Sequence, residues 1–428
     1  MSLQRCWILC TVVDNFGDAG VCWRLARQLS AEQAMAVTLF IDRPQTLAAL
    51  EPRLRTELES THTLDAVHIR TWPQETTPED LPDILISAFG CHPPAWLRAR
   101  LARAPSRPIW VNLEYLSAEP WVEGCHRLIS TKPDDGAVEH FFYPGFTPGT
   151  GGLLRERGLL ERVDEFRRGP ARQAWLRQNG LPIQAGRRLA SLFCYPEAPV
   201  AAWLSAIAVC DQPWLVVVPA GVAELAVAAV MGKPLQPGEQ ASLGSLCVMR
   251  LPFLPQSDYD RLLWSSDLNL VRGEDSWVRA HWATSPFIWQ AYRQENDAHW
   301  PKVEAFIDRI RTVIDPGTSS APPEKATPRQ RPPGGRPPEE VPPEAISLEE
   351  SQPAAIPSAN APATASAAVR ALETMTAAWN GRGPIEPAWA AFSGQLDALS
   401  EYFQVWRTHL SQQDDLAAQL ARHCRDRL

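Results

Sequence analysis

The chain has 428 residues, of which 45% are hydrophobic and 17 are tryptophan, so it can form roughly two to three domains with buried cores. The formal net charge of −8 argues against general nucleic-acid binding, which prefers a basic surface. No stretch approaches the roughly 18 apolar residues of a membrane-spanning helix, and the first residues do not resemble a signal peptide. We therefore expect a soluble, cytoplasmic protein that binds neither nucleic acid nor membranes.

Strand-like and helix-like segments alternate over the first 150 residues. The strand-like segments are residues 7–13, 37–41, 67–70, 84–89, 109–111 and 127–130. Amphipathic segments at 21–29 and 95–102 lie between them. Because strands separated by helices form mostly parallel sheets with covered faces, this pattern predicts an α/β domain over residues 1–150.

A second alternating series follows a linker that we predict at residues 151–180, with a charged helical segment at 159–168. Its strand-like segments are residues 188–193, 215–218, 247–251, 268–271 and 287–289. The segments with helical periodicity between them are residues 201–209, 222–231, 256–264 and 278–282. This pattern predicts a second α/β domain over residues 181–315.

The composition changes sharply at residues 316–362, which hold 13 of the 40 prolines and no aromatic residue. Such a segment cannot bury enough apolar surface to offset its chain entropy, so we predict a disordered insertion over residues 316–366. Residues 367–428 follow, with helical character at 367–379 and 395–425. We expect a helix of this C-terminal region to pack back on the first domain.

The turn after the first strand carries two carboxylates, Asp14 and Asp18, with Asn15 between them. Gly17 and Gly20 allow the backbone to pass close to a ligand. Because no lysine follows and the GxGxxG fingerprint is absent, the turn suits a cation or a proton better than nucleotide phosphates. Either carboxylate could instead cap the following helix, and this motif alone does not separate the two interpretations.

A second strand end, Arg272-Gly273-Glu274-Asp275-Ser276, also leads into a helix-like segment. The backbone amides there and the Ser276 hydroxyl suit a diphosphate, and Glu274 suits a sugar hydroxyl. Asp275 or Ser276 could also be the N-cap of the helix, a role that is compatible with anion binding.

Aromatic residues follow two further strands of the second series: Phe193 and Tyr195 after one, and Phe253 after the other, with Gln256 close behind. Rings at the strand ends of one sheet can hold a nucleobase, and Gln256 can bond to its edge. Core packing is the commoner role of a single phenylalanine. The neighbouring prolines nevertheless favour rim loops over mid-strand positions.

Asp258-Tyr259-Asp260 matches the DxD pattern with which some glycosyltransferases bind a divalent metal. It begins a helix-like run, where acidic residues are favoured in any case, so we expect no metal there. The nine histidines form no HxxxH or HExxH motif and the nine cysteines no CxxC pair. We therefore expect buried, reduced thiols and no zinc site.

With these residues in view, the chain resembles the EarP family, bacterial protein-arginine rhamnosyltransferases that modify translation elongation factor P. The matching stretches are VVDNFGDAGVCWRLARQL, NLEYLSAEPWVEGCH, PGFTPGTGGLLRE, SLFCYP, and RGEDSWVRAHWA continuing to PFIWQAY. They are spread over both predicted domains, so the resemblance covers nearly everything except the proline-rich segment.

The resemblance implies the GT-B architecture, in which two Rossmann-like domains face a central cleft. It also implies an inverting, metal-independent transfer of L-rhamnose from dTDP-β-L-rhamnose to an arginine of elongation factor P, with no cofactor. This modification would activate the factor for the translation of polyproline stretches.

The resemblance further implies roles for single residues. Asp18 would be the general base, Asp14 would orient the guanidinium, and Glu274 would be an essential donor-side carboxylate. The other donor-site residues would be Phe193, Phe253 and Gln256 around the thymine, Tyr259 as a third aromatic wall, and Tyr195, Asp275 and Ser276 near the diphosphate. Arg272 would be a further residue of the donor site. The candidates for the acceptor side are Asn15, Glu114 and Tyr115.

Two other functions stay open on the residues alone. One is a nucleotide-sugar transferase or epimerase with a small-molecule acceptor, which would consume its donor without any protein acceptor. The other is a non-enzymatic partner of the translation machinery, against which the retention of Asp14, Asp18 and Glu274 argues. A dehydrogenase is disfavoured because the glycine fingerprint is missing.

Overall fold

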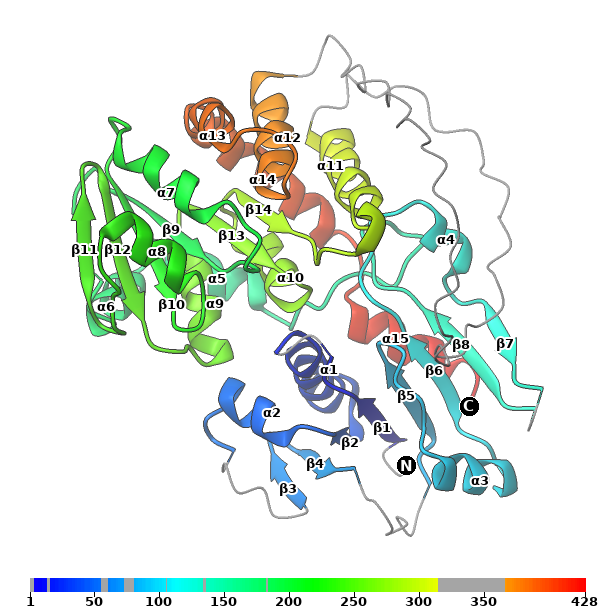
Figure 1. Ribbon diagram of the computed structural model, residues 1–428. Helices are drawn as coiled ribbons and strands as arrows, with labels where there is room; N and C mark the ends of the chain where they lie inside the picture. The colour runs from blue at the N-terminus through cyan, green and yellow to red at the C-terminus, as the bar shows by residue number, and fades with distance from the viewer. Residues whose placement is uncertain are drawn as a thin grey trace, which may run out of the picture.

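The structure is a computed structural model that describes residues 4–13, 16–54, 61–72, 81–104, 106–133, 136–181, 184–314 and 366–428. Asp14 and Asn15 lie outside these residues, as does the predicted insertion at 316–366 except for Ser366. Two sheets with their helices form two lobes, which we call the N-terminal and the C-terminal lobe (Figure 1). In the part of the chain that is described, no helix is both long and apolar enough to cross a membrane.

The sheet of the N-terminal lobe has the strand order β3-β4-β2-β1-β5-β6-β8-β7. Its strands are β1 (Gln4–Cys10), β2 (Met35–Ile41), β3 (Thr61–Leu64), β4 (Val67–Thr71), β5 (Ile84–Ala88), β6 (Ile109–Leu113), β7 (Ile129–Thr131) and β8 (Val138–Phe142). The central strands are parallel, as predicted, and the edge strands β3 and β7 are antiparallel to their neighbours.

Three details of this sheet differ from the prediction. Strands β3 and β8 carry no continuous apolar run and were missed; β8 contains the buried Glu139, whose charge is paired with Lys132 at 3.0 Å. Strand β1 ends at Cys10, not at Val13, because the chain leaves the sheet there and the backbone N–H of Val12 donates to the Asp42 carboxylate at 2.9 Å. This early end frees residues 11–13 to form part of a loop.

The sheet of the C-terminal lobe has the order β11-β12-β10-β9-β13-β14. Its strands are β9 (Arg188–Leu192), β10 (Trp214–Pro219), β11 (Gln240–Leu243), β12 (Leu246–Leu251), β13 (Leu268–Arg272) and β14 (Phe287–Gln290). All the predicted strands are present and parallel, and β11 is an additional antiparallel edge strand. Buried, nearly continuous apolar runs such as that of β10 are what strands covered on both faces require.

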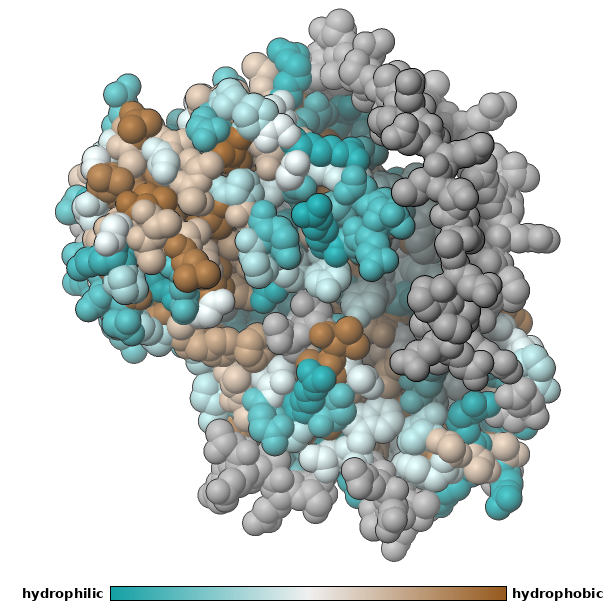
Figure 2. Space-filling view, in the orientation of Figure 1, coloured by the Kyte–Doolittle hydropathy of each residue, from teal (hydrophilic) through white to brown (hydrophobic). Residues whose placement is uncertain are grey.

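Helices cover both sheets and connect the lobes (Figure 1). Those of the N-terminal lobe are α1 (Gly17–Gln33), α2 (Pro44–Leu50), α3 (Ala95–Arg103) and α4 (Trp121–Cys125). The connecting helices are α5 (Leu159–Arg168) and α6 (Pro170–Gln178). Those of the C-terminal lobe are α7 (Val200–Ala208), α8 (Glu224–Met231), α9 (Gln256–Ser265), α10 (Asp275–Trp282), the 3₁₀ turn η1 (Glu295–Asp297) and α11 (Trp300–Ile314). On the face shown in Figure 2, hydrophobic side chains gather over α7 and α8.

The C-terminal region forms α12 (Ala367–Trp379), α13 (Ile385–Ser393), α14 (Leu396–Ser411) and α15 (Leu416–Arg425). The helical character predicted at 395–425 is present as two helices, with a break where Asp415 caps α15 by accepting a hydrogen bond from the Ala418 N–H. The return of the chain to the first lobe is confirmed: α15 packs on α1, and Gln28 of α1 donates to Asp415 at 2.9 Å.

Candidate active site

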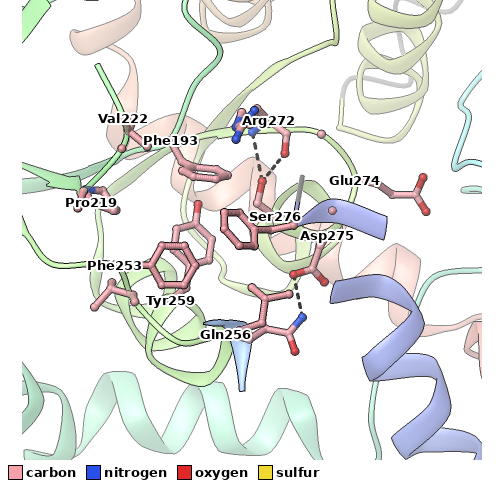
Figure 3. A pocket seen from close by; sticks show the side chains of 17 residues that line it. Phe193, Pro219, Val222, Phe253, Gln256, Tyr259, Arg272, Glu274, Asp275 and Ser276 are labelled. Carbon is pink, nitrogen blue, oxygen red and sulfur yellow. Dashed lines mark hydrogen bonds between the residues drawn. The ribbon is translucent and has the colours of Figure 1, made fainter. Parts of the chain in front are cut away.

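A cavity of about 240 Å³ opens between the two lobes (Figure 3). Most of its wall comes from the C-terminal lobe, at the carboxyl ends of β9, β10, β12 and β13. Phe16, Gly17 and Leu50 line it from the N-terminal lobe. Ligands of α/β sheets bind at this edge, so the position of the cavity alone makes it a candidate donor site.

Aromatic rings form one end of the cavity (Figure 3). The ring centroids of Phe193 and Tyr259 are 5.4 Å apart, and those of Phe16 and Phe253 are 4.9 Å apart. Phe253 is 39% exposed, so its ring is not fully buried in the core and can contact a ligand. Burial raises the pKa of the Tyr259 phenol, which therefore stays neutral. This end of the cavity suits a flat, uncharged ring.

Arg272 brings a positive charge to the same cavity. Its guanidinium lies 4.6 Å from the ring centroid of Phe193 and 4.4 Å from that of Tyr195. These contacts are cation–π interactions. Among the described residues, none is a hydrogen-bond partner of the buried Nε of Arg272. Tyr195 itself is buried behind Arg272 and is not part of the cavity wall. Its influence on a bound anion would thus act through the guanidinium.

The loop between β13 and α10 is closed by Ser276. Its hydroxyl donates a hydrogen bond to the Arg272 carbonyl. The same hydroxyl accepts a hydrogen bond from the backbone N–H of Arg272 at 3.2 Å. Ser276 thus fixes the loop that presents the start of α10 to the cavity. The dipole and backbone N–H groups at a helix start favour an anion beside Arg272.

Gln256 and Asp275 lie together at the other end of the cavity (Figure 3). The Gln256 amide donates to the Asp275 carboxylate at 3.1 Å and to the Gly20 carbonyl of α1, also at 3.1 Å. A Cβ atom at Gly20 would lie 3.0 Å from the Gln256 amide nitrogen. Gly20 is therefore the residue that lets α1 approach this end of the donor cavity.

Asp18 lies beside the cavity, next to its lining residue Gly17. It is 2% exposed; its Oδ2 accepts a hydrogen bond from the Val13 N–H at 2.8 Å, and its Oδ1 accepts one from the Tyr115 hydroxyl at 3.4 Å. The N-cap of α1 is Phe16, whose side chain makes no cap hydrogen bond. Asp18 is thus a buried carboxylate that two hydrogen bonds hold close to the cavity wall.

The acceptor-side candidates are only partly located. Tyr115 follows β6, stacks on Phe89 with centroids 4.6 Å apart, and is 43% exposed. Glu114 precedes it, and its backbone N–H donates to the Phe142 carbonyl at 3.0 Å. The predicted roles of Asp14 and Asn15 concern positions outside the described residues.

Glu274 connects the lobes at a second point. It is the N-cap residue of α10, and its carboxylate accepts a hydrogen bond from the Leu116 N–H at 2.9 Å. Its side chain points away from the aromatic rings (Figure 3). Leu116 follows Tyr115, whose hydroxyl donates to Asp18. The Glu274 carboxylate therefore connects the donor cavity to the loop that contains Tyr115.

Sequence reasoning missed a set of buried charges between the lobes, which we call the interlobe ion cluster: Arg24, Glu156, Asp260, Asp275 and Arg279. Arg24 donates to both oxygens of Asp260, at 2.9 and 2.8 Å, and to Asp275 at 2.7 Å. Arg279 donates to Asp260 and to Glu156. Burial opposes the charge of Glu156, but Arg279 and Arg24 lower its pKa to about 2.

The DxD pattern has a structural explanation. Asp260 belongs to the interlobe ion cluster, and Asp258 accepts hydrogen bonds from the Trp175 indole at 3.1 Å and from Arg261 at 2.8 Å. Both carboxylates thus already have cationic or N–H partners. Over the described ranges, histidine, cysteine and carboxylate side chains form no group of three or more that could hold a metal ion.

The sequence is similar to proteins of one family along most of its length. The family model described as "Elongation-Factor P (EF-P) rhamnosyltransferase EarP" matches residues 6–325. A protein-arginine rhamnosyltransferase of Pseudomonas putida is 45% identical over 323 residues, which are 74% of this chain and 85% of that protein. Another, from Pseudomonas aeruginosa, is 37% identical over 421 residues, which are 98% of each chain.

Solved structures agree with this similarity. One that describes EarP-mediated arginine glycosylation of translation elongation factor EF-P matches with a TM-score of 0.61 and 28% identity, over 99% of both chains. The spinosyn rhamnosyltransferase SpnG in complex with thymidine diphosphate matches with a TM-score of 0.51 over 98% of this chain and 100% of that chain. At 9% identity the second match shows a shared fold alone, and that fold is the predicted GT-B architecture.

Proposed function

Because the chain belongs to the EarP family of protein-arginine rhamnosyltransferases, we propose that it transfers L-rhamnose from dTDP-β-L-rhamnose to one arginine of elongation factor P. The observation that carries this proposal is the juxtaposition of the aromatic, cationic cavity of the C-terminal lobe with the buried carboxylate Asp18 of the N-terminal lobe. Activation of the factor for polyproline translation would be the consequence of the modification.

The cavity supports a thymidine diphosphate donor. Phe193, Phe253 and Tyr259 offer faces for a pyrimidine. At the cavity's opposite end the Gln256 amide donates to Asp275 and Gly20, so its remaining group for a ligand is the amide oxygen. Arg272 lines the same cavity, and its guanidinium charge would attract the diphosphate. One bound ligand could therefore use the rings and the cation of a single cavity.

Asp18 would act on the acceptor as a general base. A guanidinium has a pKa above about 12, so a carboxylate with an ordinary pKa near 4 cannot deprotonate it in a separate step. The proton must leave while the bond between the nitrogen and the sugar forms, when that nitrogen becomes acidic. Asp14 would orient the guanidinium, and the carboxylates would compensate its charge until the proton is transferred.

The displacement would invert the anomeric centre, because the arginine would attack from the N-terminal lobe while the diphosphate leaves toward the C-terminal lobe. Arg272 and the start of α10 would stabilise the leaving diphosphate in place of a divalent metal. The ion pairs of Asp258 and Asp260 support a metal-independent reaction, since both carboxylates of the DxD pattern are already engaged.

The test is the intact mass of purified elongation factor P after incubation with the enzyme and dTDP-β-L-rhamnose. The proposal expects the addition of one deoxyhexose, which disappears when the acceptor arginine is replaced by lysine. An α configuration of the product, read from its NMR coupling constants, would support inversion. Donor consumption at the same rate without any protein acceptor would instead favour the alternative, a transferase or epimerase for small molecules.

A further inference from the structure

The carboxylate of Asp275 is shared between the two lobes. It lines the donor cavity from the first residue of α10, where it accepts a hydrogen bond from Gln256. Its other oxygen accepts the Nε–H of Arg24 at 2.7 Å, and Arg24 belongs to α1 of the opposite lobe. A side chain of the donor site is therefore fixed by a residue of the lobe that carries Asp18.

Arg24 is held in one geometry by its surroundings. It is 5% exposed, and its two terminal nitrogens form a bidentate pair with Asp260 while Nε is left for Asp275. This arrangement uses the planar fork of a guanidinium, and an ammonium group has no equivalent geometry. The position of α1 relative to the donor cavity thus depends on the shape of Arg24 as well as on its charge.

Asp18 and Arg24 lie on the same helix. Asp18 is in the first turn of α1 and Arg24 is less than two turns further along it, with the intervening residues buried. A rotation or shift of α1 would move both side chains together. The bond between Glu274 and the Leu116 N–H fixes the loop that carries Tyr115, the second partner of the Asp18 carboxylate.

The charges of the interlobe ion cluster bear on an anionic ligand as well. The cluster contains three carboxylates and two guanidinium groups, and one of the carboxylates, Asp275, lines the donor cavity. Loss of the charge of Arg24 would leave Asp275 without its cationic partner beside the expected diphosphate. A neutral residue in place of Arg24 would therefore weaken donor binding. A lysine would retain the positive charge but not the bidentate geometry of the guanidinium.

We propose that Arg24 is a positioning residue, which sets the distance between Asp18 and the bound donor by holding α1 against Asp275 and Asp260. This inference rests on the proposed function for the identity of the reaction. It does not depend on Arg24 touching either substrate. Its effect is on the turnover of bound donor, and donor affinity is a separate property that depends on charge.

The experiment compares Arg24→Lys and Arg24→Gln with the wild-type enzyme. A misplacement of reacting groups by about 1 Å can cost on the order of a hundredfold in rate, so we expect Arg24→Lys to lose about 10- to 100-fold in kcat. Its Kd for dTDP-β-L-rhamnose, measured by calorimetry, should stay within about threefold of the wild-type value because the charge is retained. Arg24→Gln should lose both kcat and donor affinity.

Arg407→Lys is the matched control. Arg407 is also a mostly buried arginine, and it donates to the Asp164 carboxylate at 2.7 Å and to the Leu160 carbonyl at 2.9 Å, away from the donor cavity. We expect its kcat to match the wild-type value. Asp275→Asn should make the loss caused by Arg24→Lys smaller than in the wild-type background, because two residues that act through one contact are not additive.

Hydrogen exchange gives a readout without transfer. Binding of dTDP should slow exchange in the first turns of α1 in the wild-type protein, and Arg24→Lys should abolish that protection. A kcat within twofold of wild type, a donor Kd that worsens as much as kcat falls, or an equal loss in Arg407→Lys would each overturn the positioning role. If the wild-type enzyme transfers no rhamnose, the proposed function fails, while the exchange result still decides for or against the coupling.

Discussion

At the scale of single residues, the site depends on how Asp18 is held. Both carboxylate oxygens accept hydrogen bonds, one from the Val13 backbone and one from the Tyr115 hydroxyl, and the side chain is shielded from bulk water. These bonds orient the carboxylate, while the burial strengthens its interaction with a cation that enters the cleft. A general base for a protein-borne guanidinium needs both properties.

Tyr115→Phe tests this arrangement. The phenylalanine retains the stack on Phe89 and removes only the hydroxyl that donates to Asp18. We expect kcat to fall about 3- to 10-fold, since a hydrogen bond to a charged group contributes roughly 1.5 kcal/mol or somewhat less at 3.4 Å. The Kd for the donor should not change. Steady-state kinetics measures kcat, and calorimetry measures the donor Kd. Weaker donor binding with an unchanged kcat would contradict this role of Tyr115.

Glu274→Gln separates two roles of one carboxylate. The amide oxygen of glutamine can still accept the hydrogen bond from the Leu116 N–H, so the link between the lobes is preserved. If the negative charge is needed on the donor side, kcat falls on the order of a hundredfold while the melting temperature stays unchanged. Turnover close to that of the wild-type enzyme would show that Glu274 serves only as a link.

Residues at the ends of predicted strands could be identified as site candidates from the sequence. Phe193, Phe253, Gln256 and Asp275 were predicted in this way, and the structure brings them to one cavity, although their roles stay predictions. Arg24 could not be found so, because its partners Asp260 and Asp275 are 236 and 251 residues away in the chain. In the sequence, Arg24 does not differ from the other polar residues of α1, such as Arg27 and Gln28.

At the scale of secondary-structure elements, α1 is the central helix of the molecule. Residues 18–26 are all buried, because β2, α10 and α15 pack around this helix. The sequence predicted an amphipathic segment at 21–29, but its polar residues Arg24 and Gln28 are buried in the structure together with the apolar ones. The helix carries the candidate base at its start, and its polar contacts reach both lobes.

Gly20→Ala tests the close approach of α1 to the donor site. In a helix, alanine is favoured over glycine by about 1 kcal/mol, so the melting temperature should not fall. The new Cβ would nevertheless lie 3.0 Å from the Gln256 amide nitrogen and 3.2 Å from the Asp275 carboxylate. Since these neighbours must move, we expect kcat to fall about 10-fold.

Gly124→Ala is the control for that variant. Gly124 is also helical, in α4, and a Cβ there would meet no atom within 4 Å. We expect its kcat to equal the wild-type value. A kcat of Gly20→Ala that also equals the wild-type value, measured at saturating donor, would show that the contact between α1 and α10 does not set the rate.

Two elements show why boundaries were harder to predict than the fold. Strand β8 was missed because its buried Glu139 interrupts the apolar pattern. The carboxylate of Glu139 is paired with Lys132 and accepts a hydrogen bond from the Asn112 amide. The break between α14 and α15 was missed because the apolar periodicity continues across it. It depends on the cap at Asp415 and on the bond between the Leu416 N–H and the Leu153 carbonyl.

At the scale of the whole molecule, buried aromatic residues hold the lobes and the C-terminal helices together. Phe146 lies within 6 Å of Trp277, His281, Phe306 and Trp406, which come from α10, α11 and α14. The Trp406 indole donates to Nδ1 of His281 at 2.9 Å, which fixes this histidine in its neutral form. The relative placement of the lobes is thus supported by packing as well as by the interlobe ion cluster.

The buried histidines predict the response of stability to acid. Burial lowers the pKa of His281 to about 3 and that of His423 to about 3, whereas both imidazoles titrate near 6.5 in the unfolded chain. Between about pH 6.5 and pH 3 the unfolded state therefore binds more protons, and the free energy of unfolding falls as the pH falls. At pH 5, His281 alone should account for a loss of about 2 kcal/mol.

Urea unfolding at several pH values measures this effect. We expect the free energy of unfolding to fall as the pH is lowered from about 6.5 to 5. In His281→Gln, the slope of this free energy against pH should correspond to about one proton fewer taken up on unfolding. Stability that is constant over this range, or a slope that His281→Gln leaves unchanged, would contradict a neutral, buried His281.

In the proposed function the two lobes contribute separable functions: the C-terminal lobe binds the donor, and the N-terminal lobe removes the proton. The most direct measurement is the donor Kd and the single-turnover rate of rhamnose transfer to elongation factor P, compared in Asp18→Asn and Phe253→Ala. We predict that Asp18→Asn abolishes transfer and binds the donor as the wild-type enzyme does, and that Phe253→Ala binds the donor weakly but transfers at a milder cost once saturated. Near-wild-type transfer by Asp18→Asn, or loss of donor binding in that variant, would contradict the account.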